Sequence, residues 1–306
     1  MERPFGPGTR AASPGSPWAR WLHAVELGGR GRYAAAAAVL GRLLADPAVP
    51  RVVAAHAAVA LASHRRQQGG HAAARVLDAR ALALAAAAPD DGDPRPDGTD
   101  VLGAVVDALV GLAADAVGLG DAAGAVRLLD AAADRRHPGW RPAVRAGWVR
   151  AELALLTGRA GDAVAPAEEA LRSARAAGSP RHVLKSRLVR AVVEAVHHPD
   201  AVVLAELDAL VADAVPRWPP LVWPAQLAGA DLAERLSQLS VTESSPAAND
   251  SRRRAADASA NGRRSDAARR RHAGRLAVND LYQASDGPGK RLMGESLWVP
   301  DRLPVT

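Results

Sequence analysis

The chain has 306 residues, a formal net charge of +6 and no cysteine. The absence of cysteine excludes disulfides, thiolate metal sites and cysteine nucleophiles. Hydrophobic residues make up 48% of the chain but aromatic residues only 3%, so alanine, leucine and valine supply most of the apolar surface. Alanine is the best helix former and fills little space. The composition therefore indicates helices that approach one another closely, and its bias towards arginine, alanine, glycine and proline is typical of a GC-rich bacterial genome.

The first 17 residues are rich in proline and glycine, which predicts a disordered leader, residues 1–17. They lack the apolar core of a signal peptide. The apolar run from residue 34 to residue 44 is too short to span a bilayer. We therefore expect a cytoplasmic protein with no membrane contact.

Apolar residues then recur at helical spacing, between glycines and prolines that end each segment. Ser16 is positioned as the N-cap of the first helix, and Thr99 or Asp100 as the N-cap of the fifth. An acidic stretch, residues 89–100, lacks the spacing of a calcium loop and is expected to be a solvated insertion. The pattern predicts helices at residues 17–28, 33–45, 52–66, 71–88, 101–117, 122–134, 142–156, 162–176, 181–196, 201–215 and 224–239.

Turn glycines recur at regular intervals and small residues follow each of them. The glycines are Gly31, Gly69, Gly120 and Gly158, spaced by 38, 51 and 38 residues, and a fifth turn is expected at Asp200. Small side chains on one face let two helix axes approach, and such hairpins bury their faces by stacking. Five residues after each turn lie Ala36, Ala74, Ala125, Ala163 and Ala205, and twelve after it lie Leu43, Ala81, Ala132, Ala170 and Ala212.

The most complete unit combines Gly31-x-Tyr33, Ala36, Leu43-Leu44 and Asp46-Pro47, and the segments after Gly69 and Gly158 repeat parts of it. These motifs resemble the tetratricopeptide repeat over residues 18–239, with a spacing longer than the usual length of about 34 residues and a single turn tyrosine. The resemblance implies an all-α fold, a right-handed solenoid of stacked antiparallel helix hairpins. A more general helical-hairpin solenoid and a non-repetitive alanine-rich bundle are the alternatives.

The resemblance also implies that the first helix of each pair lines a concave groove that holds a protein or peptide. Arginines in that groove suit an acidic partner, because a guanidinium binds a carboxylate through two hydrogen bonds. The alternative is that these arginines lie on solvated faces. The groove candidates are Trp21, Val25, His56, Ser63, Arg66, Asp107, Val117, Arg145, Trp148, Glu152, Arg187, Arg190 and Glu194. Of these we select Trp21, Arg66, Arg145, Trp148, Glu152, Arg187 and Arg190 as partner-binding residues.

The C-terminal part carries the basic charge. Between residues 251 and 276 lie nine arginines and two aspartates, which account for the whole positive excess. Residues 240–275 contain almost no large apolar residue and are expected to form a disordered, arginine-rich linker. Residues 276–306 regain apolar character and are expected to dock onto the repeats or onto a partner, and the alternative is an unstructured end. The arginines that could contact nucleic acid or an acidic partner are Arg252, Arg253, Arg254, Arg263, Arg264, Arg269, Arg270 and Arg271.

No motif in the chain predicts catalysis. His197, His198 and Asp200 lack a sensibly spaced third ligand and fit a turn better than a metal site. We therefore expect a non-catalytic adaptor, without metal or cofactor, that binds a partner protein or peptide in its groove. The alternative is a nucleic-acid-associated regulator that acts through the arginine-rich tail, although this tail lacks aromatic residues that stack on bases.

Overall fold

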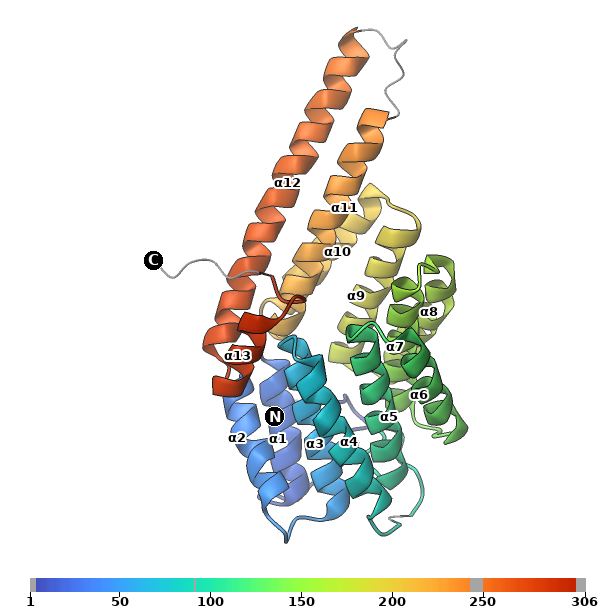
Figure 1. The fold of residues 1–306 in the computed structure, drawn as a ribbon, viewed down its shortest axis with the longest axis vertical. Helices are drawn as coiled ribbons and strands as arrows, with labels where there is room; N and C mark the ends of the chain where they lie inside the picture. Colours follow the sequence, from blue (N-terminus) through green and yellow to red (C-terminus); the bar gives the residue numbers. More distant parts are fainter. Residues whose placement is uncertain (1–3, 91, 243–249, 301–306) are drawn as a thin grey trace.

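The computed structural model describes residues 4–90, 92–242 and 250–300, and in these residues the protein is all-α with thirteen helices (Figure 1). The first helices of the successive pairs are α1 (Pro17–Gly29), α3 (Arg51–Gln67), α5 (Val101–Gly118), α7 (Trp140–Leu156) and α9 (Pro180–His197). Their partners are α2 (Tyr33–Ala45), α4 (His71–Ala86), α6 (Ala122–Asp134), α8 (Ala160–Ala176) and α10 (Ala201–Ala214). The chain continues through the 3₁₀ turn η1 (Pro219–Leu221), α11 (Val222–Thr242), α12 (Asp250–Gln283) and α13 (Gly287–Glu295).

The helices form a two-layer array. Each helix packs against the next one in the chain, and the first helix of each pair also packs against the first helix of the following pair. The inner layer is therefore α1, α3, α5, α7 and α9, and the partner helices form the outer layer. Sequential helix pairs stacked in this way are consistent with a helical repeat array.

Alanines at the matched positions make the close crossings that the sequence predicted. Ala36, Ala74, Ala125 and Ala163 are all 0% exposed. The four turn glycines adopt positive φ angles of 71–80°, a conformation that glycine reaches without strain. In α10 the prediction was wrong: Ala205 and Ala212 are exposed. There the inward stripe is Val203, Leu207, Leu210 and Ala214, which is offset by two residues because the turn at Asp200 is not built on glycine.

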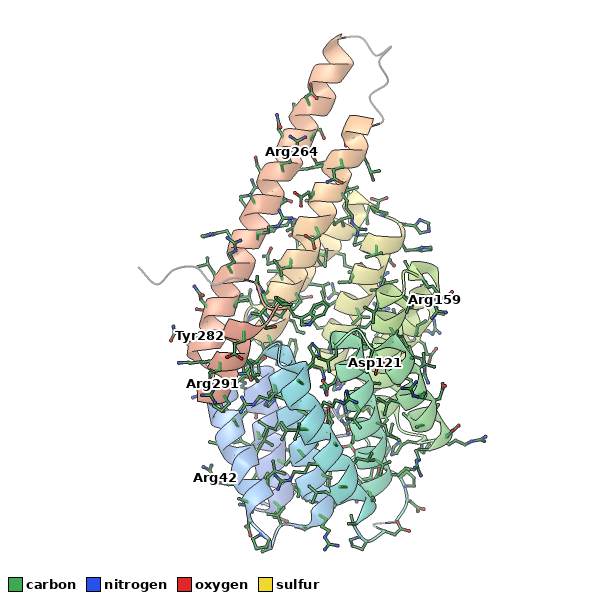
Figure 2. The ribbon with its side chains drawn as sticks, viewed as in Figure 1. Arg42, Asp121, Arg159, Arg264, Tyr282 and Arg291 are labelled. Atoms are coloured by element: carbon green, nitrogen blue, oxygen red, sulfur yellow. The ribbon has the colours of Figure 1, made fainter. Side chains whose placement is uncertain are left out.

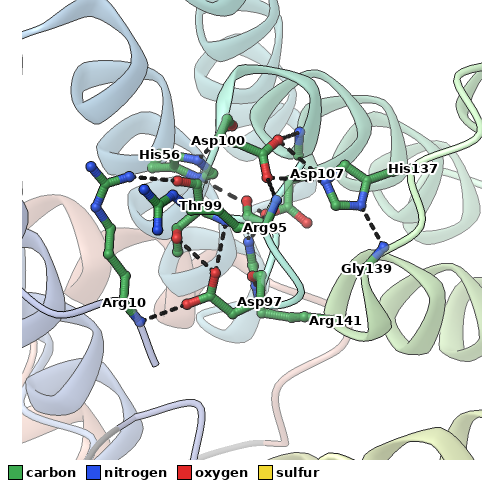
Figure 3. Close-up of polar contacts among 12 residues, drawn as sticks. Arg10, His56, Arg95, Asp97, Thr99, Asp100, Asp107, His137, Gly139 and Arg141 are labelled. Carbon is green, nitrogen blue, oxygen red and sulfur yellow. Dashed lines mark hydrogen bonds and ion pairs between the residues drawn. The ribbon is translucent and has the colours of Figure 1, made fainter. Parts of the chain in front are cut away.

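The structure corrects the expected disordered leader over residues 4–17 and the expected solvated insertion over residues 97–100, because the two segments pack together (Figure 3). Residues 89, 90 and 92–96 of the insertion are exposed, as expected, and residues 1–3 and 91 lie outside the described residues. Phe5 is 4% exposed, and the Arg10 backbone N–H donates to Asp97 over 2.9 Å. Asp97, Thr99 and Asp100 are almost fully buried. Asp100 caps α5 by accepting from the Gly103 N–H, as predicted. These buried acids are held by hydrogen bonds, which is how a folded chain accommodates buried polar groups.

The expected disordered linker is likewise corrected where it is described, since residues 240–242 end α11 and residues 250–283 form α12, which packs along α11 (Figure 1). Residues 243–249 of that linker lie outside the described residues. The two helices approach closely because α12 places small residues every seven positions: Ala260, Ala267 and Gly274 are buried, and Leu281 continues the series. Ala260 and Ala267 are each 1% exposed. The α11–α12 pair therefore crosses closely through small residues, as the helix hairpins of the array do, without large apolar side chains between the two helices.

The C-terminal segment docks onto the first helix pairs of the array. Val278, Leu281, Met293 and Val299 form one buried cluster with Tyr33. The Ala34 N–H donates to the Ala284 carbonyl over 2.8 Å. Arg65 donates two hydrogen bonds of 2.6 Å to Asp286, which also caps α13. Residues 301–306 of the expected docking segment lie outside the described residues.

The two ends of the array therefore meet. A Cβ on Gly31, in the turn after α1, would lie 2.5 Å from Leu281 of α12 and 3.6 Å from Pro220 of η1. A Cβ on Gly29 would lie 3.8 Å from Trp218. The inner layer is thus closed by α11, η1 and α12 into a ring of helices.

Among the described residues, α5 is the one helix whose length and mean hydropathy of 1.8 would suit a membrane span. It lies in the inner layer between α3 and α7, and 72% of its residues are buried inside the protein. Its apolar character is explained by packing on several sides.

Candidate functional site

A cavity of about 380 Å³ occupies the concave side of the array, inside the inner layer. Side chains from α1, α3, α5, α7 and α9 line it, together with Phe5 of the leader and the start of α11. We call it the central cavity. Five of the seven selected residues line it, namely Trp21, Arg66, Arg145, Trp148 and Glu152.

The other two selected residues lie elsewhere. Arg187 pairs with Asp213 over 2.8 Å, and Arg190 pairs with Glu194 over 2.6 Å and with Glu206. Successive helical residues are about 100° apart, so the inward stripe of α9 is 181, 185, 188, 189 and 192. Arg187 and Arg190 fall on the opposite face, which packs towards α10.

Two cations on that inward stripe, Arg181 and Lys185, are not among the residues predicted from the sequence. They are one helical turn apart and both line the central cavity. Among the described residues, neither has a carboxylate within ion-pair distance. The 181–185–188–192 spacing was the signal that could have identified them.

Other charges in the cavity are already paired. Asp107 lies between Arg141, at 2.6 Å, and Arg145, and its side chain is 1% exposed. Burial alone would raise the pKa of the Asp107 carboxyl, but the two guanidinium groups outweigh this effect and hold the pKa below its usual value. Figure 3 shows Asp107 beside His56 and Arg141.

Arg66 serves two carboxylates, Asp78 and Asp115, both of which are fully buried. Burial raises the pKa of Asp78 to about 7; the pairing with Arg66 opposes this shift and the neighbouring Asp115 adds to it. The carboxylates of Asp78 and Asp115 share the guanidinium of Arg66, so its positive charge is already neutralised and is not available to bind a ligand. It was selected for partner binding, but its ion pairs point to a role in joining α3, α4 and α5.

Lys185 and Arg181 carry the unpaired positive charge. The Lys185 ammonium lies 4.3 Å from the centre of the Trp148 ring, within cation–π range. Burial lowers the pKa of Lys185 to about 8, Glu152 opposes this shift, and Arg181, Arg145 and Arg66 add to it. Lys185 therefore remains mainly charged at neutral pH.

Several buried side-chain nitrogens in the cavity wall have no hydrogen-bond partner among the described residues. Two of them, Nε of Arg181 and Nε1 of Trp21, are hydrogen-bond donors that also lack a carboxylate within ion-pair distance. A buried donor without an acceptor costs about 1–3 kcal/mol. A ligand that brings an acceptor atom to this wall would recover that cost.

The remainder of the wall is aromatic and neutral. The Phe5 ring lies 5.7 Å from Trp21, and His182 stacks on Trp148 at 5.6 Å with an angle of 17° between the planes. Burial lowers the pKa of His56 to about 4 and that of His182 well below its usual value, so these imidazoles are neutral at neutral pH. The cavity therefore combines flat apolar walls with two free cations.

A second cavity, of about 660 Å³, opens beside the first between the leader, α1, α9 and residues 216–219. Val25 and Arg181 line both cavities. Arg181 thus lies in the wall that the two cavities share.

No group of three or more histidine, aspartate or glutamate side chains within the described residues could hold a metal ion. Comparisons with protein-family models, with curated proteins and with solved structures find no match to this chain.

Proposed function

We propose that the protein is a non-catalytic binding module, a tetratricopeptide-like right-handed array that holds an acidic segment of a partner protein on its concave side. The observation that carries this proposal is the pair Arg181 and Lys185, two cations without carboxylate partners in an aromatic-walled cavity. The side chain of a partner's aspartate or glutamate would supply the missing anion. Hydrogen bonds to charged groups are among the stronger single contacts, at about 1.5–3 kcal/mol.

The cavity fits such an anchor better than a long groove-bound segment. Binding cavities of about 300–1,000 Å³ are mostly apolar with a few placed polar groups, and the central cavity lies within that range. An acidic side chain of the partner enters, while its neighbouring residues stay at the mouth. The second cavity beside the leader provides room for those neighbours.

Panning a phage-displayed random heptapeptide library against the whole protein tests this proposal. We expect enrichment of peptides that contain aspartate or glutamate, and at least tenfold weaker binding to the Arg181→Gln variant. Arg159→Gln is the matched control, because Arg159 is 60% exposed and lies outside the cavity (Figure 2). Enrichment of neutral or basic peptides, or equal binding by Arg181→Gln, would refute the proposal.

The second candidate, nucleic-acid binding through the tail, is favoured by the hairpin of α11 and α12, which projects from the body and exposes Arg264 (Figure 2). Much of the basic charge is already used, however. Arg270 pairs with Asp208 over 2.7 Å and Arg271 pairs with Glu234. The side chains of Arg252, Arg253 and Arg254 lie outside the described residues.

Titration with a DNA duplex at two salt concentrations tests this candidate. If the tail binds phosphates, replacing Arg252, Arg253 and Arg254 together by glutamine weakens binding and flattens its salt dependence. Equal binding by the triple variant would exclude a role for these three arginines.

A further inference from the structure

The central cavity is enclosed on more sides than the groove of an open helical array. Because α11, η1 and α12 close the inner layer, residues from both ends of the array, such as Trp21 and Trp223, line the same space. Phe5 of the leader covers another side and contacts Trp21 and His182. A volume of about 380 Å³ is near the lower end for small-molecule cavities. A cavity of this volume suits a compact ligand.

The charge of the unpaired part of the wall matches a monoanion. Arg181 and Lys185 contribute two positive charges, and Glu152 in the same wall contributes one negative charge. Arg141 and Arg145 share Asp107, which leaves one positive charge over, and Arg66 pairs with Asp78 and Asp115, which leaves one negative charge over, so these two groups cancel. A phosphate group carries a charge of about −1.5 to −2 and would exceed this balance, whereas a carboxylate carries a single charge.

The shape and polarity of the remaining wall match an aromatic body. The rings of Phe5, Trp21, Trp148, His182 and Trp223 all face the cavity. Aromatic rings gain from offset and edge-to-face contacts with one another beyond the area that they bury. Trp21 Nε1 and Arg181 Nε supply unpaired donors for an oxygen of the ligand.

We propose that the central cavity binds a free aromatic monocarboxylate, a flat aryl or indolyl acid whose carboxylate lies between Arg181 and Lys185, and that this small molecule competes with the acidic segment of the partner. The competition rests on the proposed function; the binding of the small acid does not. The ligand makes the adaptor responsive to a metabolite, because the same two cations cannot serve two anions at once.

Isothermal titration of the whole protein with three probes tests the ligand class. The probes are 2-naphthylacetate, its neutral amide and decanoate, which is a flexible non-aromatic carboxylate. We expect 2-naphthylacetate to bind at least tenfold more tightly than the amide, because only the acid engages the cations. We also expect it to bind more tightly than decanoate, because only the naphthyl ring meets the aromatic wall. Equal binding of acid and amide overturns the carboxylate assignment, and equal or tighter binding of decanoate overturns the aromatic assignment.

Variants separate a real site from a general effect of charge. Arg181→Gln and Lys185→Met are expected to weaken 2-naphthylacetate binding at least tenfold and to leave amide binding unchanged. Arg159→Gln removes an equal charge outside the cavity and is expected to bind like the parent protein. Far-ultraviolet circular dichroism checks that each variant folds. If either Arg181→Gln or Lys185→Met fails to fold, the other variant still tests the proposal. No change in either folded variant overturns the proposal.

The outcomes also separate this inference from the proposed function. If the acid binds and no acidic peptide is enriched by panning, the partner proposal fails and the ligand site stands. If acidic peptides bind in an Arg181-dependent way and 2-naphthylacetate does not bind, the ligand inference fails alone. If both bind and the acid does not displace the peptide, the competition is refuted.

Discussion

Replacing Asp107 by asparagine should lower stability and raise anion binding at the same time. The Asp107 side chain is 1% exposed and forms ion pairs with Arg141 and Arg145, which are 6% and 14% exposed. The variant leaves two mostly buried guanidinium groups without their shared carboxylate. Removing one partner of a buried ion pair typically costs about 3–5 kcal/mol. For a chain of this length, that corresponds to a fall in Tm of about 5–8 °C.

The same substitution adds free positive charge to the central cavity, because Arg141 and Arg145 also line it. Binding of 2-naphthylacetate to Asp107→Asn should therefore become tighter, by about threefold or more. Thermal unfolding followed by circular dichroism measures the first effect, and isothermal titration below Tm measures the second. A loss of stability with unchanged or weaker binding would show that the two arginines do not reach the ligand.

Asp213→Asn is the matched control for this prediction. Asp213 is 56% exposed and pairs with Arg187 over 2.8 Å, far from the cavity lining. Surface ion pairs contribute about 0–1 kcal/mol, so Tm should fall by less than about 2 °C. If Asp107→Asn and Asp213→Asn lower Tm by the same amount, the prediction is refuted, because the burial of an ion pair would then not affect the stability lost when its carboxylate is removed.

Three further predictions concern the cavity and the two chain ends. The pKa of Lys185 is lowered to about 8, so this side chain loses its charge as the pH rises through that value. The affinity for 2-naphthylacetate should therefore fall about threefold or more between pH 7 and pH 9. An affinity that does not depend on pH would contradict this prediction. Replacing Phe5 by alanine should release the leader, because the ring is buried, and speed tryptic cleavage after Arg10 about tenfold or more, as measured by mass spectrometry. Replacing Asp286 by alanine removes both the ion-pair partner of Arg65 and the N-cap of α13. The free energy of unfolding, measured in urea, should therefore fall by about 3 kcal/mol. A loss below about 1 kcal/mol would be inconsistent with the Arg65–Asp286 ion pair.

The helix pairs could be predicted from the sequence because their signals are local. The bounds of α2 and α6 agree with the predicted 33–45 and 122–134, since a turn glycine or an aspartate marks the start of each helix. The inward positions of Ala74 and Ala163 follow from their distance to the turn. The register failed at Ala205 because no glycine fixes the preceding turn there.

The linker prediction failed because it searched for large apolar residues. Residues 250–275 contain almost none, yet α12 forms along α11 through small residues at Ala260, Ala267 and Gly274. The seven-residue spacing of small residues within residues 240–275 is typical of another closely packed helix pair.

The candidate site was predictable only in part. The choice of the inner helices placed Trp21, Trp148 and Glu152 in the cavity, as expected. The closure of the ring has no sequence signature, since it joins residues such as Ala34 and Ala284 that are 250 positions apart. Without that closure, an open groove for a peptide was the natural expectation, and the importance of Arg181 and Lys185 was hidden.

The meeting of the two ends also changes how the protein should come apart. In an open repeat array each unit touches only its neighbours, so terminal units fray first and stability grows unit by unit. Here the C-terminal segment holds the first helix pair through the Ala34–Ala284 hydrogen bond and the second pair through the Arg65–Asp286 ion pair. No unit of the ring is truly terminal, and losing any one of them releases both of its neighbours. The molecule should therefore resist gradual peeling and unfold as one cooperative block.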